Sequence, residues 1–168
     1  NRLRNMKNPK FDFIFLGQSI LKYQVPIDIF YSINQIYEQN FNSLHPANKQ
    51  LVGKIEKEHS LFYQGKDESK VKRHNILPIS ITDYFLKTFK HYLSWNKIRE
   101  YDLHMNSIWI NEMKEHEYNP AHVHRGTLFT GLSSVMILKL PSTYGREYSN
   151  AEVPQNGRLQ ILGAANGQ

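Results

Sequence analysis

The spacing of apolar positions predicts three helices within the first hundred residues. Pro26 at a first helical position and Asp28 in the first turn indicate a helix that begins there and extends to residue 41. Its apolar residues recur at intervals near 3.6, which is typical of a helix with one buried face: Ile29, Phe30, Ile33, Ile36, Tyr37 and Phe41. The same reasoning predicts helices over residues 46–62 and 80–95.

From residue 101 onward the hydrophobic period shortens toward two, which is typical of strands. A strand predicted over residues 101–114 places Trp109 and Asn111 on one face, with Trp109 packed in the core. A longer strand is predicted over residues 128–140, apolar on both faces from Val135 onward and therefore buried on both sides. Shorter strands are predicted over residues 11–23, 121–125 and 158–162.

The order of these elements predicts an α+β fold, with helices packed on a β-sandwich or barrel. A chain of 168 residues has the size of a single domain. Within it, residues 1–100 are interpreted as a helical support region with N-terminal strands, and residues 101–168 as the first part of a β-barrel core.

The amino-acid composition excludes several kinds of site and partner. The chain has no cysteine, which excludes disulfides, thiolate metal sites and cysteine nucleophiles and favours a reducing, cytoplasmic location. No apolar run approaches the roughly 18–20 residues of a membrane span. The net charge of +6 comes mostly from residues 1–100, without a stripe of alternating basic and aromatic residues. Nucleic acid and membrane partners are therefore disfavoured.

The segment of residues 119–124 (NPAHVH) holds the strongest candidate chemistry. In an extended chain, His122 and His124 point to the same face, so both imidazoles can bind one metal ion. Imidazole ligands without thiolates suit iron, zinc, copper or nickel. The alternative is a surface pair or a pair held by hydrogen bonds, because eight histidines in one chain make a chance pair at this spacing common.

The sequence around this pair resembles the 2-oxoglutarate/Fe(II)-dependent oxygenases found in phage and bacteria, which are prolyl-hydroxylase-like. Their pattern runs from Trp-x-Asn through Asn-Pro-x-His-x-His/Asp to Leu-Ser-Gly-Val-Tyr-Tyr-Leu-Lys-Val-Pro. The resemblance covers about residues 105–163. The matching positions are Trp109, Asn111, Asn119, Pro120, His122, His124, Leu132, Ser133, Val135, Leu138, Lys139, Pro141, Gly157 and Leu159.

This resemblance implies a double-stranded β-helix, the jelly-roll barrel also found in cupins. It implies an oxidoreductase, a dioxygenase that uses Fe(II), 2-oxoglutarate and O2 to hydroxylate a C–H bond of a small-molecule or peptidyl substrate. His122 and His124 would be metal ligands, and Asn111 would face the cofactor pocket. A phage-encoded protein of this kind would act in the host cytoplasm.

The chain departs from the family pattern in three ways. His124 occupies the position of the usual carboxylate ligand, an arrangement similar to cupin metal sites, although the expected cupin glutamate is replaced by Leu128 or Phe129. Met136 and Ile137 replace the aromatic pair. The distal histidine and the 2-oxoglutarate-binding arginine are expected beyond residue 168. Two alternatives therefore stay open: a non-catalytic β-barrel binding module and a cupin-type metal protein.

Overall fold

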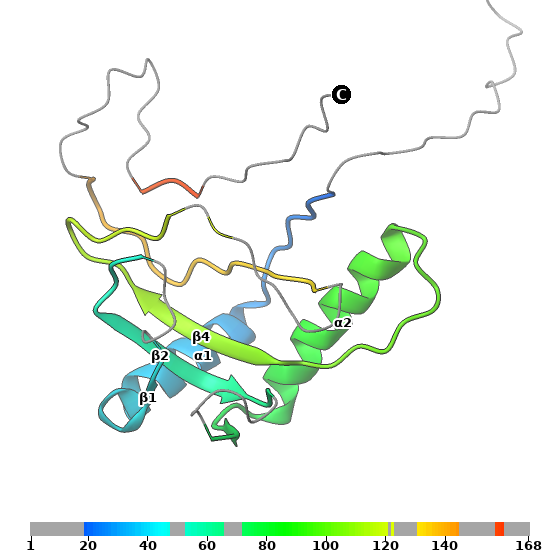
Figure 1. The fold of residues 1–168 in the computed structure, drawn as a ribbon, viewed down its shortest axis with the longest axis horizontal. Coiled ribbons are helices and arrows are strands. Elements are labelled where there is room, and N and C mark those ends of the chain that lie inside the picture. Colours follow the sequence, from blue (N-terminus) through cyan, green and yellow to red (C-terminus); the bar gives the residue numbers. More distant parts are fainter. Residues whose placement is uncertain are drawn as a thin grey trace, which may run out of the picture.

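The structure is a computed structural model that describes residues 19–47, 53–65, 72–120, 122, 131–144 and 157–159. Two helices and four strands lie within these residues (Figure 1). In chain order they are α1 (Ile27–Asn40), a short 3-10 helix (Phe41–Ser43), β1 (His45–Pro46), β2 (Lys57–Tyr63), β3 (His74–Asn75), α2 (Ile79–Trp95) and β4 (Ser107–Glu112). Neither described helix is long and apolar enough to cross a membrane.

The sheet is antiparallel and has β2 at its centre. One edge of β2 pairs with β4 along its whole length, and the other pairs with the short strands β1 and β3. Ser60 pairs with Trp109 and Phe62 with Ile108, so Leu61 is an extra residue in a β-bulge. These helices and this sheet make an α+β arrangement, as expected; the jelly-roll barrel stays a prediction.

The helix predicted over residues 46–62 is wrong. Its described residues instead form β1, most of β2 and the approach to β2. The apolar pair Leu61 and Phe62 fits a helical spacing, but in the structure both are buried because a bulge lets two consecutive residues of one strand enter the core. Pairing with β4, which lies about fifty residues downstream, therefore overrides the local pattern.

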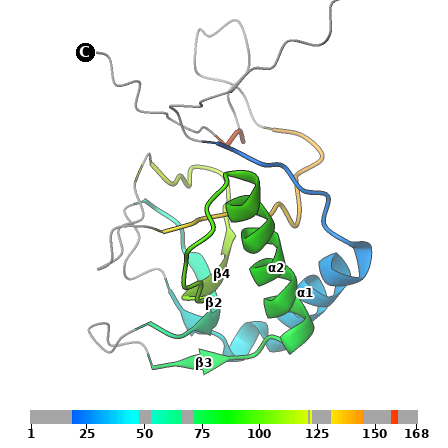
Figure 2. The same cartoon turned by 90° about the vertical axis from the view of Figure 1, so that its right-hand side faces the viewer.

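The other two predicted helices are confirmed. Helix α1 begins one residue after Pro26, which occupies the N-cap position, and it buries Ile29, Ile33 and Tyr37. Helix α2 begins after Pro78 in the same way. A proline fits such a helix start because its missing N–H is not needed there. In Figure 2 both helices are seen against the sheet, with α2 standing beside β2 and β4.

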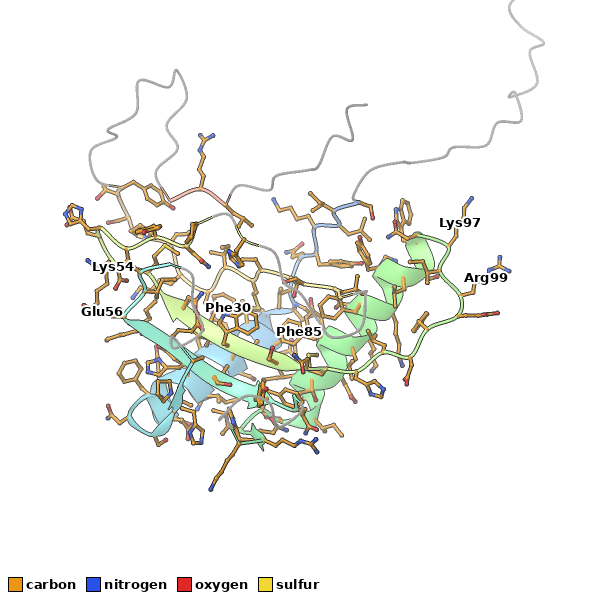
Figure 3. All side chains as sticks on the ribbon, viewed as in Figure 1. Phe30, Lys54, Glu56, Phe85, Lys97 and Arg99 are labelled. Carbon is orange, nitrogen blue, oxygen red and sulfur yellow. The ribbon has the colours of Figure 1, made fainter. Side chains whose placement is uncertain are left out.

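One hydrophobic core joins the two helices to the sheet. Its buried members are Ile29, Ile33, Tyr37, Leu61, Phe62, Leu77 and Ile81. Phe85 of α2 packs against this cluster and lies in the middle of the molecule in Figure 3. The same view places Lys97 and Arg99 on the loop after α2, on the far side from Lys54 and Glu56 at the start of β2.

The expected core position of Trp109 is wrong. Trp109 is 37% exposed, whereas its neighbours Ile108 and Ile110 pack against the core. The pairing of β4 with β2 determines which face of β4 is buried, because it places Ile110 opposite His59 on the face that α1 covers. Trp109 and Asn111 do share a face, as the strand period predicts, but it is the face turned away from α1.

The strand predicted over residues 128–140 is not found in its described part. Residues 131–140 belong to no helix or strand, and they run as an extended segment past β4 (Figure 1, yellow to orange). Met136 and Leu138 pack against the core, while Val135 and Ile137 are more than half exposed. The segment therefore alternates between two environments instead of being buried on both sides. The predicted strands over 11–23 and 158–162 are absent from residues 19–23 and 158–159, and the rest of both lies outside the described residues.

A chain of hydrogen bonds ties α1 to the sheet. The Tyr37 hydroxyl donates to Glu112 Oε1 at 3.0 Å, so the second contact of this hydroxyl, with His59 Nδ1 at 3.1 Å, must be donated by the imidazole. Lys57 Nζ lies 3.4 Å from Glu112 Oε2 and over the Phe41 ring. Burial and the Glu112 carboxylate raise the pKa of Tyr37 well above its ordinary value.

We expect Tyr37→Phe to lower the free energy of unfolding by about 1–2 kcal/mol, because it removes the hydroxyl that joins two polar groups under a helix. Urea unfolding measures the effect. The matched control is Tyr31→Phe, on the same helix but with its ring 64% exposed, which should change little. Equal effects of the two substitutions would show that the hydrogen-bond chain adds no stability.

Candidate functional site

The candidate site begins with a cross-strand pair on the sheet face turned away from α1. Glu58 of β2 lies opposite Asn111 of β4 in the antiparallel ladder. Both side chains point away from Tyr37, because their strand neighbours His59 and Glu112 contact it. The Asn111 side chain hydrogen-bonds to the Glu58 carboxyl group. The position that the sequence assigns to a cofactor pocket thus touches a glutamate from a distant strand.

Glu58 is a buried acidic residue, only 6% exposed. Burial raises the pKa of its carboxyl group, and the Asn111 hydrogen bond and the charge of His122 lower this pKa to a smaller extent. Asn111 thus contacts the Glu58 carboxyl group directly, whereas the exposed His122 acts on it only through its charge.

The orientation of the His122 ring is set by its own chain. Nδ1 lies 2.7 Å from the carbonyl oxygen of Pro120, and a carbonyl can only accept, so Nδ1 donates. In the neutral ring the lone pair then belongs to Nε2, the atom that would bind a metal ion or a proton. Histidine ligands in metal sites are commonly oriented by such a bond from the other nitrogen.

The segment that leads to His122 is fastened to the start of β2. Lys54 and Tyr118 exchange two backbone hydrogen bonds of 2.9 and 3.1 Å. Glu117 accepts from the backbone N–H groups of Glu56 and Lys114 at 2.9 and 2.7 Å, which lowers the pKa of its carboxyl group. Figure 3 places Lys54 and Glu56 together at this end of the sheet. The result is a fixed approach to residues 119–122.

Three oxygen atoms in this region are buried and have no hydrogen-bond donor. They are Glu58 Oε2, Asn111 Oδ1 and Asn119 Oδ1. An acceptor removed from water without a donor costs about 1–3 kcal/mol, and more when it is charged. Two of the three belong to the cross-strand pair of Glu58 and Asn111.

The site combines residues that the sequence analysis found with one that it missed. Asn111 pairs with Glu58, the charge of His122 acts on that glutamate, and His124 lies outside the described residues. Glu58 was missed because residues 46–62 were interpreted as a helix. The local sequence holds no signal that could have found it, because residues 57–60 (KEHS) are all polar and show no alternation of polar and apolar residues. Among the described residues, no three His, Asp or Glu side chains form a metal-binding group.

The other histidines are engaged elsewhere or exposed. His74 Nδ1 donates to the Lys72 carbonyl at 2.9 Å, and its Nε2 lies 2.9 Å from the Ser60 hydroxyl oxygen. His91 on α2 lies 2.7 Å from the Tyr23 hydroxyl. His104 and His116 are ion-paired with acidic neighbours on the surface. None of these contacts brings a second imidazole to Glu58.

Comparisons with protein-family models, with curated proteins and with solved structures found no match to this chain. The resemblance to the 2-oxoglutarate/Fe(II)-dependent oxygenases stays a prediction.

Proposed function

We propose that this chain belongs to an Fe(II)- and 2-oxoglutarate-dependent dioxygenase that hydroxylates a C–H bond of a small-molecule or peptidyl substrate. The observation that supports this proposal is the pairing of Asn111 with the buried carboxyl group of Glu58, whose pKa the charge of His122 lowers. His122 was selected from the sequence as a metal ligand and Asn111 as a pocket residue, and the two come from separate segments of the chain.

The residues present fit a first-row divalent metal. Imidazole nitrogen and carboxylate or amide oxygen are ligands that Fe(II) accepts. Nδ1 of His122 donates to the Pro120 carbonyl, so Nε2 is the ring nitrogen that would bind a metal, and the buried oxygens Glu58 Oε2 and Asn111 Oδ1 have no donor. His122 would hold the metal together with His124. Iron, when bound, would supply the oxidation of 2-oxoglutarate by O2.

The protein's own contribution would be to hold this centre in place. The Pro120 carbonyl fixes the tautomer of His122. The backbone pairing of Lys54 with Tyr118 holds the segment that carries it. Asn111 holds the Glu58 carboxyl group in place by a hydrogen bond. A site that is positioned before the metal arrives loses less conformational entropy when it binds.

A cupin-type metal protein is the second candidate. Cupin sites combine histidines with a glutamate, and the nearby Glu58 supplies a carboxylate that the local sequence around His124 lacks. Both candidates require a metal ion at His122. They differ in whether 2-oxoglutarate binds to that metal.

We expect the chain to bind Fe(II) without oxygen and to develop a visible charge-transfer band when 2-oxoglutarate is added. His122→Ala should abolish the band and most of the bound iron, because it removes the oriented imidazole. The matched control is His104→Ala, which removes an exposed histidine whose side chain is 79% accessible. Anaerobic absorption spectra and iron content provide the measurements.

Each result decides between the candidates. Iron binding that needs His122 but gives no band with 2-oxoglutarate would favour the cupin-type protein. Iron content unchanged by His122→Ala would contradict both candidates.

A further inference from the structure

We propose that the exposed face of α2, together with the loop after it, binds single-stranded nucleic acid. This inference does not depend on the metal site proposed above, and it concerns the opposite end of the molecule from Lys54 (Figure 3). It assigns basic side chains to the phosphates and aromatic side chains to the bases. Proteins hold unpaired strands through these two kinds of contact without reading their sequence.

The charge of this face is the first argument. From residue 84 to residue 99 the chain has four basic residues and no acidic one. Lys87 and Lys90 are exposed on α2, and Lys97 and Arg99 extend outward from the loop that follows it (Figure 3). None of the four forms an ion pair with a residue that the structure describes. A polyanion is therefore the complementary partner. Acidic residues lie only at the borders of this stretch: Asp83, Glu100 and Asp102.

Two exposed aromatic rings accompany these cations. Residues three or four apart on a helix share a face, which groups Lys87 and Lys90 with His91. Trp95 lies four residues further on and is 67% exposed, and Tyr101 of the following loop is 44% exposed. An exposed ring of this kind offers a flat surface on which a base can stack. The sequence shows no stripe of alternating basic and aromatic residues, because helical periodicity brings this group to one side.

A hollow of about 350 Å³ lies where α2 ends. Its lining provides two cations, two hydroxyl groups and one apolar side chain: Ser94, Lys97, Ile98, Arg99 and Tyr101. Pockets for small ligands begin at about 300 Å³, so the hollow has room for one nucleotide. Polar residues separate Trp95, Ile98 and Tyr101 along the chain, whereas a segment that lies on a membrane gathers its apolar residues on one face. The lining therefore favours a nucleotide over a lipid surface.

The backbone of Lys97 supplies an independent argument. Its φ of 59° is a left-handed conformation, for which glycine is the usual residue at the end of a helix. The N–H of Lys97 donates to the Ser94 carbonyl at 3.0 Å, and that of Ile98 donates to the Leu93 carbonyl at 2.9 Å. The strain of a lysine in this conformation exceeds the favourable effect of a cation near a helix C-terminus. Folding alone thus favours glycine, and the lysine side chain is free to serve binding.

Fluorescence anisotropy with a labelled oligothymidine of about 12 nucleotides tests the proposal on the full chain. We expect Lys97→Gly to weaken binding by about 3- to 5-fold. The same substitution should raise the melting temperature by about 2–4 °C, because glycine relieves the backbone strain. A loss of affinity combined with a gain in stability cannot result from unfolding. The matched control Lys54→Gln removes an exposed lysine at the other end of the molecule and should change the affinity little.

A second pair of variants tests the stacking contact. We expect Trp95→Ala to weaken binding of the oligothymidine by about 10-fold. The matched control is Tyr31→Ala, which removes a ring of similar exposure, 64%, from α1 and should leave the affinity unchanged. A duplex of the same length should bind more weakly than the single strand, because its bases are stacked on one another and have no free face for Trp95.

Three results would overturn the proposal. Equal losses of affinity for Lys97→Gly and Lys54→Gln would show that net charge alone attracts the strand. Binding to vesicles of phosphatidylserine and phosphatidylcholine, without binding to the oligothymidine, would assign this face to a membrane surface. Binding to neither probe would show that the face has no polyanionic partner. Iron binding at His122 is measured separately, so this inference and the proposed function can fail independently.

Discussion

Leu61→Ala is expected to lower the free energy of unfolding by about 2–5 kcal/mol. Leu61 is fully buried, and it is the bulged residue of the central strand. Its side chain belongs to the cluster that joins both helices to β2, so a cavity there removes contacts with several elements at once. Its carbonyl oxygen accepts from the N–H of Ile76 at 3.0 Å, which holds the connection to α2 in place.

Chemical denaturation followed by circular dichroism measures this loss. The matched control is Leu140→Ala, a leucine of the extended segment that is 59% exposed, and its effect should stay below about 0.5 kcal/mol. A Leu61→Ala chain as stable as the control would mean that the cluster around the bulge is not the main core of the protein.

Gly53→Ala is expected to lower the free energy of unfolding by about 1–3 kcal/mol, because it adds a methyl group where there is no space for one. A Cβ at this position would collide with the carbonyl oxygen of Tyr118, and it would lie 2.8 Å from Pro120 Cδ and 2.9 Å from Asn119 Cα. These are backbone and ring atoms that cannot rotate away. The paired segments must separate, which breaks the two hydrogen bonds between Lys54 and Tyr118.

The same substitution should also weaken metal binding, since the displaced segment carries His122. Faster amide exchange at Lys54 and Tyr118 would report the separation, and a Co(II) titration would report its effect on the site. Gly131→Ala is the control, because a Cβ there meets no atom within 4 Å. If Gly53→Ala left exchange and Co(II) affinity unchanged, the backbone pairing at this position would not be what holds His122.

Two residues of the candidate site, His122 and Asn111, could be selected from local sequence patterns. His122 was found from its spacing to a second histidine and from the Asn-Pro before it, both of which lie within six residues. Asn111 was found because strand alternation relates it to Trp109. Such features depend on backbone geometry over a few residues, which the order of side chains reports directly. The prediction that Trp109 packs in the core was wrong. Strand alternation shows which residues share a face of the sheet, but it does not show which face the helices cover.

Glu58 shows the opposite case. Nothing within ten residues of it indicates a metal or a cofactor, and the apolar residues nearby favoured a helix. Its position opposite Asn111 depends on the pairing of β2 with β4. Long-range pairing of this kind is decided by the balance of burial and backbone hydrogen bonds over the whole chain.

The sequence by itself determined both described helices, the extended conformation around Asn111 and two of the candidate site residues. It did so because helix periodicity, proline at helix starts and strand alternation are local properties. Only the tertiary structure decided that residues 57–63 form the central strand, that Trp109 faces away from α1 and that Glu58 lies opposite Asn111. These depend on contacts between segments far apart in the chain, whose energies no local pattern contains.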